Sequence, residues 1–311
     1  MDWIFVGIGL IMLLIGGDAL VRGAVALSAK LGIPTLIVSL TVVAFGTSAP
    51  ELLIAIQSAL NGVPELALGN VIGSNTANVL LVLGVPALLT GLSCADVGSR
   101  SNYLYLVGVT VFAIAIFYTQ PLYIWQGTLL LGILALVLFV SYRAAQGSRK
   151  KRAELESEVG EMQIETWKMV AFLIAGLIML PLGAKLLVDG AVNISTAFGV
   201  PEAIIGLTLV ALGTSLPELA TTVMAGFRRQ GDVAFGNVLG SNMFNLLAIV
   251  GVASFFGPLP VDPEFFQLDL WIMLASTLLL APFVMLRWEL NKIWGIAFIS
   301  CYVAYVIVLL T

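Results

Sequence analysis

The sequence repeats itself at an offset of 167 residues, from Glu51 to Glu218, and this duplication constrains the fold more than any other feature. Residues 46–51 read Gly-Thr-Ser-Ala-Pro-Glu, and residues 213–218 read Gly-Thr-Ser-Leu-Pro-Glu. A second motif, Gly-Asn-Val-Ile-Gly-Ser-Asn-Thr-Ala-Asn at 69–78, returns at 236–245 as Gly-Asn-Val-Leu-Gly-Ser-Asn-Met-Phe-Asn. One offset superposes the halves without a gap, so a duplicated unit is the simplest cause.

The composition places both copies in a membrane. Hydrophobic residues make up 60% of the chain and charged residues 10%, whereas a soluble domain carries about 25% charged residues. A helix needs about 20 apolar residues to cross a bilayer, and the alternating pattern of barrel strands is absent. We therefore predict an all-α polytopic membrane protein with ten transmembrane helices, at residues 3–27, 34–60, 65–90, 103–119, 122–142, 167–196, 201–227, 233–256, 268–286 and 293–310.

The sequence also limits the available chemistry. No basic segment precedes the first apolar run, so this run is expected to be a retained span rather than a cleaved signal peptide. Cys94 and Cys301 do not form a CxxC pair, which argues against a thiolate metal site or a disulfide framework. The chain has no His, the commonest proton-relay and transition-metal ligand. Any ion chemistry must therefore use oxygen.

The repeat predicts the topology. We divide the chain into a first five-helix repeat at 1–142, a charged linker at 143–166 and a second five-helix repeat at 167–311. Equivalent points are five spans apart, an odd number, so the second copy must enter the membrane from the opposite side. In such inverted-topology repeats, substrate sites lie near the bilayer midplane on interrupted helices.

Basic residues predict the orientation, because cytoplasmic loops retain Lys and Arg. The loops that carry these residues alternate with loops and termini that carry neither. Both termini are thus expected outside a cell (inner) membrane and the central linker inside. The basic residues of the loops expected on the cytoplasmic side are Lys30, Arg100, the cluster from Arg143 to Lys168, Arg228, Arg229, Arg287 and Lys292.

Two acidic residues stand inside apolar runs. A charge near the bilayer centre costs at least roughly 2.5–3.5 kcal/mol, so an intramembrane carboxylate is by default a candidate for function. Glu51 and Glu218 have no basic residue within a turn or two. Pro50 lacks an N–H and crowds the carbonyl of Gly46, so the span should kink there and release backbone oxygens. An ion or water must then satisfy those oxygens.

The neighbouring residues add oxygen ligands. Thr47 and Ser48 share a helix face with Glu51, at spacings of four and three residues. Calcium takes 6 to 8 oxygens in flexible geometry, and two Glu charges neutralise one calcium or two sodium ions. Without a cation, two adjacent buried carboxylates repel, so protons should compete with calcium. The four-residue spacing recurs in the pairs Ser74 and Asn78, and Ser241 and Asn245.

Two alternatives stay open for other polar residues. Ser, Thr and Asn side chains in spans commonly hydrogen-bond neighbouring helices, and this applies to Ser39, Thr41, Asn70 and Asn75. The i, i+4 pairs Asp18–Arg22 and Lys185–Asp189 are either local salt bridges or contacts that stabilise one state of a moving helix.

Both copies of the two motifs resemble the sodium/calcium exchanger family of the calcium/cation antiporters, whose repeats read G-T-S-x-P-E and G-N-x-x-G-S-N-x-x-N or D. The resemblance implies five-plus-five inverted repeats and sodium/calcium countertransport by alternating access, with spans 1 and 6 sliding across an ion-binding core. It implies calcium ligation by Glu51, Glu218 and the backbone oxygens of Thr47 and Thr214. Sodium would add Ser48, Ser215, Ser74, Ser241 and the backbone oxygens of Ala44 and Ala211, and Asn78 and Asn245 complete the centre.

Asn245 further defines the expected type. Potassium-dependent members resemble this pattern with Asp at that position, so the resemblance argues against potassium transport. The linker is too short for the calcium-sensing domains of animal exchangers, which suggests a minimal prokaryotic member. We expect no enzymatic activity, no cofactor, no nucleic-acid partner and no obligatory protein partner. The alternatives are a calcium/proton antiporter at the same paired-Glu site and, in a different class, a passive cation channel.

Overall fold

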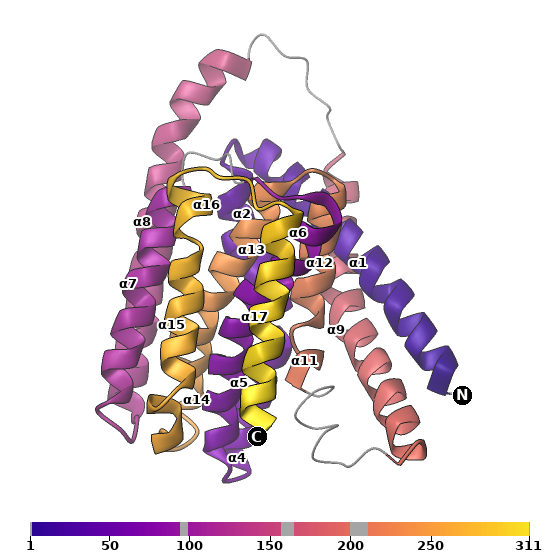
Figure 1. The fold of residues 1–311 in the computed structure, drawn as a ribbon. Coiled ribbons are helices and arrows are strands. Elements are labelled where there is room, and N and C mark those ends of the chain that lie inside the picture. The colour runs from indigo at the N-terminus through magenta and orange to yellow at the C-terminus, as the bar shows by residue number, and fades with distance from the viewer. Residues whose placement is uncertain (1, 94–98, 157–164, 200–210, 311) are drawn as a thin grey trace.

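A computed structural model describes residues 2–93, 99–156, 165–199 and 211–310, and these form a bundle of helices (Figure 1). In the first half, the helical elements are α1 (Asp2–Leu31), α2 (Thr35–Val38), η1 (Ser39–Val43), α3 (Ala44–Thr47), α4 (Ala49–Leu60), α5 (Pro64–Ala77), η2 (Asn78–Val82), α6 (Gly84–Thr90), α7 (Ser99–Phe117) and α8 (Ile124–Glu156). The C-terminal part of α8 projects beyond the rest of the bundle (Figure 1).

The second half repeats this order. Its elements are α9 (Thr166–Ala197), α11 (Ala211–Gly213), α12 (Leu216–Phe227), α13 (Gly231–Phe244), η4 (Asn245–Ile249), α14 (Val250–Ala253), η5 (Pro263–Phe266), α15 (Asp269–Leu279), α16 (Ala281–Met285) and α17 (Lys292–Leu310). The start of the predicted span 201–227, the middle of the linker 143–166 and Cys94 lie outside the described residues.

The duplication is visible in the backbone. Helices α4 and α12, α5 and α13, and the π-helical segments η2 and η4 begin and end at positions that differ by the sequence offset. Left-handed backbone conformations recur in the same way, at Gly32 (φ 62°) and Gly199 (φ 75°), and at Gly62 (φ 75°) and Arg229 (φ 57°). The fold is therefore the predicted all-α arrangement of two inverted repeats.

The basic loops gather at one end of the bundle. An isolated β-bridge joins Leu92 to Leu290, which ties together two loops of the predicted inner side. A second bridge joins Leu122 to Leu259, in loops of the predicted outer side. Lys30, at the end of α1, donates to Thr166 Oγ1 (2.6 Å) at the start of α9. Which end faces the cytoplasm stays a prediction.

The spans divide into a buried core and a lipid-facing periphery. By length and composition, seven described helices could cross a membrane, or eight if the bent pair α2–α4 counts as one span. Buried residues make up 94% of the apolar window in Gly231–Ala253, against 17% in Lys292–Leu309. The span Gly231–Ala253 therefore lies at the centre of the bundle, while α17 presents most of its surface to lipid.

Glycines join α1 and α9 into a close pair. They recur every seven residues on both helices, and a Cβ at any of them would come within 2.6–3.0 Å of the partner helix. Small residues allow such close approach of backbones in membranes. These two helices therefore form one tightly packed unit beside the core (Figure 1). The seam consists of Gly9, Gly16 and Gly23 on α1 and Gly176, Gly183 and Gly190 on α9.

Candidate cation-binding site

Spans 2 and 7 are interrupted at the serine of the first motif. Ser48 (φ −86°, ψ 8°) separates α3 from α4, and Ser215 (φ −83°, ψ 1°) precedes α12. The two parts of span 2 meet at an angle of 45°. Pro50 and Pro217 stand in the first two positions of the following helix, where a missing N–H is tolerated. The predicted break in span 2 is therefore confirmed.

The two carboxylates follow directly after these breaks. Glu51 and Glu218 lie in the first turns of α4 and α12, and both are completely buried. Unbonded N–H groups give a helix N-terminus partial positive charge, which favours a carboxylate there. Neither carboxylate forms an ion pair with any residue that the structure describes. The site thus concentrates two acidic groups without a basic partner.

Hydrogen bonds across the repeats hold the two motifs together. The Ser48 hydroxyl donates to Oε1 of Glu218 (3.0 Å). The Thr47 hydroxyl donates to Oδ1 of Asn237 (3.2 Å) and lies 3.5 Å from Oγ of Ser241. These residues are far apart in the sequence, so packing of the two repeats assembles the site.

Buried oxygens without a protein partner converge on the same motifs. An unsatisfied buried polar atom costs about 1–3 kcal/mol, so each such atom requires an explanation. Within the described ranges, eight buried side-chain atoms lack a hydrogen-bond partner, and all belong to the two repeated motifs. They are seven oxygens and one nitrogen: Glu51 Oε1 and Oε2, Glu218 Oε2, Ser74 Oγ, Ser215 Oγ, Asn78 Oδ1, Asn245 Oδ1 and Asn70 Nδ2. Oxygen atoms are the ligands that a hard cation takes, so a bound cation would explain why these seven oxygens lack a protein partner.

The family model of the sodium/calcium exchanger proteins matches residues 1–143 and 168–311. The chain belongs to the sodium/calcium exchanger family. CaxA from Alkalimonas amylolytica is 35% identical over 97% of this chain and 96% of its own length. The sodium/calcium exchanger MaX1 from Methanosarcina acetivorans is 30% identical over 97% of this chain and 96% of its own length. The structure of the sodium/calcium exchanger from Methanococcus jannaschii superposes with a TM-score of 0.84 at 29% identity. The match covers 98% of this chain and 97% of that one.

The remaining predicted ligands of this exchanger-family chain lie beside the breaks. The Ala44 carbonyl accepts the Ser48 N–H (3.0 Å) and the Thr47 hydroxyl (3.3 Å). Thr214 donates to Oδ1 of Asn70 (3.4 Å), as Thr47 does to Asn237 in the other repeat. Ala211 is the first residue of α11, and its side chain is outside the described part. No cluster of three Asp, Glu, Cys or His residues occurs among the described residues, and the acidic groups of this site are the two glutamates alone.

The exchanger core has a local feature that the sequence analysis missed. Asn78 and Asn245 are the first residues of the π-helical segments η2 and η4. Single π-turns within α-helices are rare and often occur at functional sites. Both segments begin at the last residue of the second motif, so the repeat preserves the irregularity together with the side chain.

The interhelical interpretation of the other polar residues is largely confirmed. Ser39 donates to the Val233 carbonyl (2.7 Å), and Asn75 donates to the Asn242 carbonyl (3.5 Å). It is wrong for Thr41, which bonds the Ile37 carbonyl of its own span (2.8 Å). The short hydroxyl side chain of a Thr in a helix can donate to a backbone carbonyl of the preceding turn.

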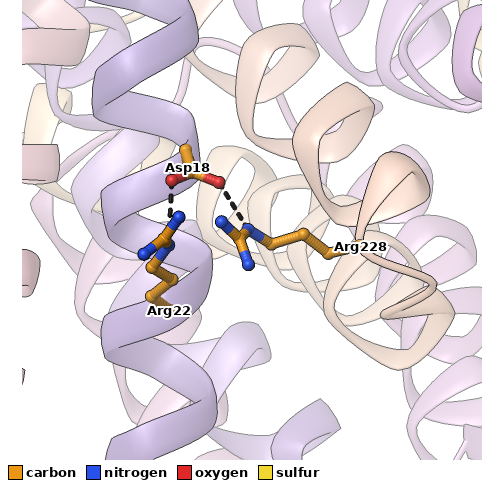
Figure 2. A network of polar contacts seen from close by, with 3 residues as sticks. All are labelled: Asp18, Arg22 and Arg228. Atoms are coloured by element: carbon orange, nitrogen blue, oxygen red, sulfur yellow. Dashed lines mark hydrogen bonds and ion pairs between the residues drawn. The ribbon is translucent and has the colours of Figure 1, made fainter.

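An ion-pair network links α1 to the core. Asp18 binds Arg22 on the same helix (2.9 Å) and also Arg228, directly after α12 (Figure 2). The pair Lys185–Asp189 in the other repeat is local and well exposed (2.9 Å). Asp18 thus connects α1 to the end of α12, a contact that the i, i+4 spacing did not predict.

Proposed function

We propose that this chain is a sodium/calcium antiporter of a bacterial or archaeal cell membrane that extrudes calcium from the cytoplasm on the sodium gradient. As a member of the exchanger family, it is a multi-pass membrane antiporter and not an enzyme. The observation that carries the proposal is the buried pair Glu51 and Glu218, in two motifs whose buried oxygens lack a partner within the described protein.

The charge of the site supports calcium and sodium as alternative substrates. Two ionised carboxylates balance one divalent cation or two monovalent cations, so either occupancy leaves the site nearly neutral. The unpartnered side-chain oxygens of the two motifs are donors of the kind that calcium takes. Magnesium demands a stricter octahedron and loses water reluctantly, which disfavours it in a site built from several flexible groups.

We assign the ligands as the motifs suggest. Calcium is bound by Glu51, Glu218 and the backbone oxygens of Thr47 and Thr214. Sodium ions additionally use the hydroxyls of the paired serines and the backbone oxygens of Ala44 and Ala211. Asn78 and Asn245 close the centre, where neutral amide oxygens add ligands without adding charge. The paired serines are Ser48, Ser215, Ser74 and Ser241.

Alternating access is supported by the packing of the outer helices. The glycine seam makes α1 and α9 one unit, whereas the core helices carry all of the unpartnered site atoms. We propose that this unit slides along the core and exposes the site to one side at a time. The same model places both termini outside and the central linker in the cytoplasm, following the distribution of basic residues.

The rival function is calcium/proton exchange. Neither oxygen of Glu51 has a hydrogen-bond partner within the described protein, so a proton could replace a cation at this carboxylate. A dependence on sodium at fixed pH separates the two functions.

The test is uptake of radioactive calcium into proteoliposomes loaded with sodium, at constant pH. We expect uptake when the external solution lacks sodium and none when sodium is equal on both sides. With the membrane potential held at zero, calcium should accumulate above its external concentration, which a passive channel cannot achieve. Equal uptake driven by a proton gradient without sodium would establish the rival function, and downhill leakage alone would indicate a channel.

The Asp18 network gives a prediction about turnover. Arg228→Gln removes one of two basic partners of Asp18, and so weakens the contact between α1 and the end of α12. We expect the maximal rate to change several-fold, while the KM for calcium stays constant because Arg228 does not touch the site. Arg229→Gln is the matched control, since it removes the same charge from a neighbouring exposed side chain. An unchanged rate in both variants would make the network purely structural.

A further inference from the structure

Four asparagines form a crossed set of hydrogen bonds between the repeats. Nδ2 of Asn78 donates to Oδ1 of Asn242 (3.0 Å), and Nδ2 of Asn245 donates to Oδ1 of Asn75 (3.1 Å). Each acceptor residue then bonds the backbone of the other: Asn242 Nδ2 to the Asn75 carbonyl (3.2 Å), and Asn75 Nδ2 to the Asn242 carbonyl (3.5 Å). All four side chains are at most 1% exposed. The arrangement follows the pseudo-symmetry of the repeats.

These bonds fix the direction of two amides. Because the NH₂ groups of Asn78 and Asn245 are held by the opposite repeat, their Oδ1 atoms must point the other way. Both Oδ1 atoms are buried and lack a hydrogen-bond partner within the described protein. A neutral amide that is free to rotate could present either its oxygen or its NH₂ group to a cation, and only the oxygen is a ligand.

We propose that Asn75 and Asn242 are positioning residues that keep the carbonyl oxygens of Asn78 and Asn245 directed at the transported cation. This inference rests on the proposed function in assigning a cation to the site. Asn75 and Asn242 have no unpartnered atom of their own, so they act through the opposite repeat. Partners that orient a ligand commonly account for 10–100-fold in metal affinity.

The crossed geometry predicts which pairs are coupled. Asn75 acts through Asn245, and Asn242 acts through Asn78, although Asn75 and Asn78 lie one turn apart on the same span. A residue that merely stabilised the span would show no such preference for the opposite repeat.

The experiment is a double-mutant cycle on equilibrium binding of calcium and, separately, of sodium to the purified full-length protein. We expect Asn75→Leu to weaken binding roughly tenfold or more, and to have no further effect in protein that already carries Asn245→Leu. The losses of cation affinity caused by Asn75→Leu and by Asn78→Leu should instead multiply when the two substitutions are combined. Thr76→Val is the matched control, because Thr76 is also fully buried but its hydroxyl bonds, among the described residues, only the Ile72 carbonyl of its own helix. The Thr76→Val variant should bind calcium and sodium with wild-type affinity.

Each outcome decides a separate question. If the wild-type protein binds both cations but Asn75→Leu and Asn245→Leu have additive effects on the binding free energy, the positioning role is overturned and the proposed function is left intact. Crossed coupling without sodium-driven calcium transport would support the positioning role and overturn the exchange. A wild-type protein that binds neither cation would overturn both. If Asn75→Leu does not elute as a monodisperse protein, the symmetric cycle of Asn242 with Asn78 tests the same rule.

Discussion

Glu218→Gln is expected to abolish sodium-driven calcium uptake, and Glu51→Gln should do the same. Glutamine keeps the size of the side chain but removes one of the two negative charges and turns an acceptor into a donor. We expect the apparent calcium affinity to fall at least about 100-fold, which corresponds to roughly 2.7 kcal/mol. Radioactive calcium uptake into sodium-loaded proteoliposomes measures this loss.

The same substitutions should not unfold the protein. A buried charge without a basic partner is costly, and replacement by a neutral group of similar volume is often neutral or stabilising. We therefore expect Glu51→Gln to melt at or above the wild-type temperature in cation-free buffer, since neither Glu51 oxygen has a partner in the described protein. At Glu218, the amide oxygen of glutamine can still accept the bond from Ser48.

A matched control is available on the next span. Glu65→Gln removes an exposed carboxylate from the first turn of α5, so it changes the net charge equally without touching the site. Its transport should equal that of wild type. Normal transport by Glu51→Gln or Glu218→Gln would contradict the assignment of the paired carboxylates as cation ligands.

The features that the sequence predicted correctly follow from its duplication. A gapless offset requires equivalent residues to occupy equivalent places, so the two broken helices and the opposed orientation of the repeats could be inferred together. The break at Ser48 was predictable because Pro50 removes a donor from the helix. A break between α15 and α16 was missed, although Pro282 gives the same signal.

Other features depend on packing that one sequence cannot reveal. The π-helical segments begin at Asn78 and Asn245 without a local proline or glycine at those positions. The bond between Asp18 and Arg228 joins residues of different repeats and has no symmetric equivalent among the described residues. The crossed bonds of Asn75 and Asn242 depend on how the two central spans meet. Spacing within one helix cannot predict such a contact.

The meeting of the repeats itself depends on a glycine. A Cβ at Gly240 would stand 2.3 Å from the carbonyl oxygen of Leu40 and 2.6 Å from Cβ of Ala44. We expect Gly240→Ala to lower the melting temperature clearly, because overpacking typically costs about 1–3 kcal/mol and here the obstacle is backbone. Calcium transport should fall further than the amount of folded protein does. Ser241, directly after this glycine, lies beside Thr47 of the first motif.

Gly132→Ala on α8 is the control, because a Cβ there meets no atom within 4 Å. It should leave both melting temperature and transport at wild-type values, since alanine is the better helix former. Melting in detergent, followed by tryptophan fluorescence, and uptake per folded molecule measure the two effects. If Gly240→Ala transported normally, the site would tolerate a shift between the repeats. The cross-repeat bonds of Ser48, Thr47 and the four asparagines could then not be what sets the positions of the cation ligands.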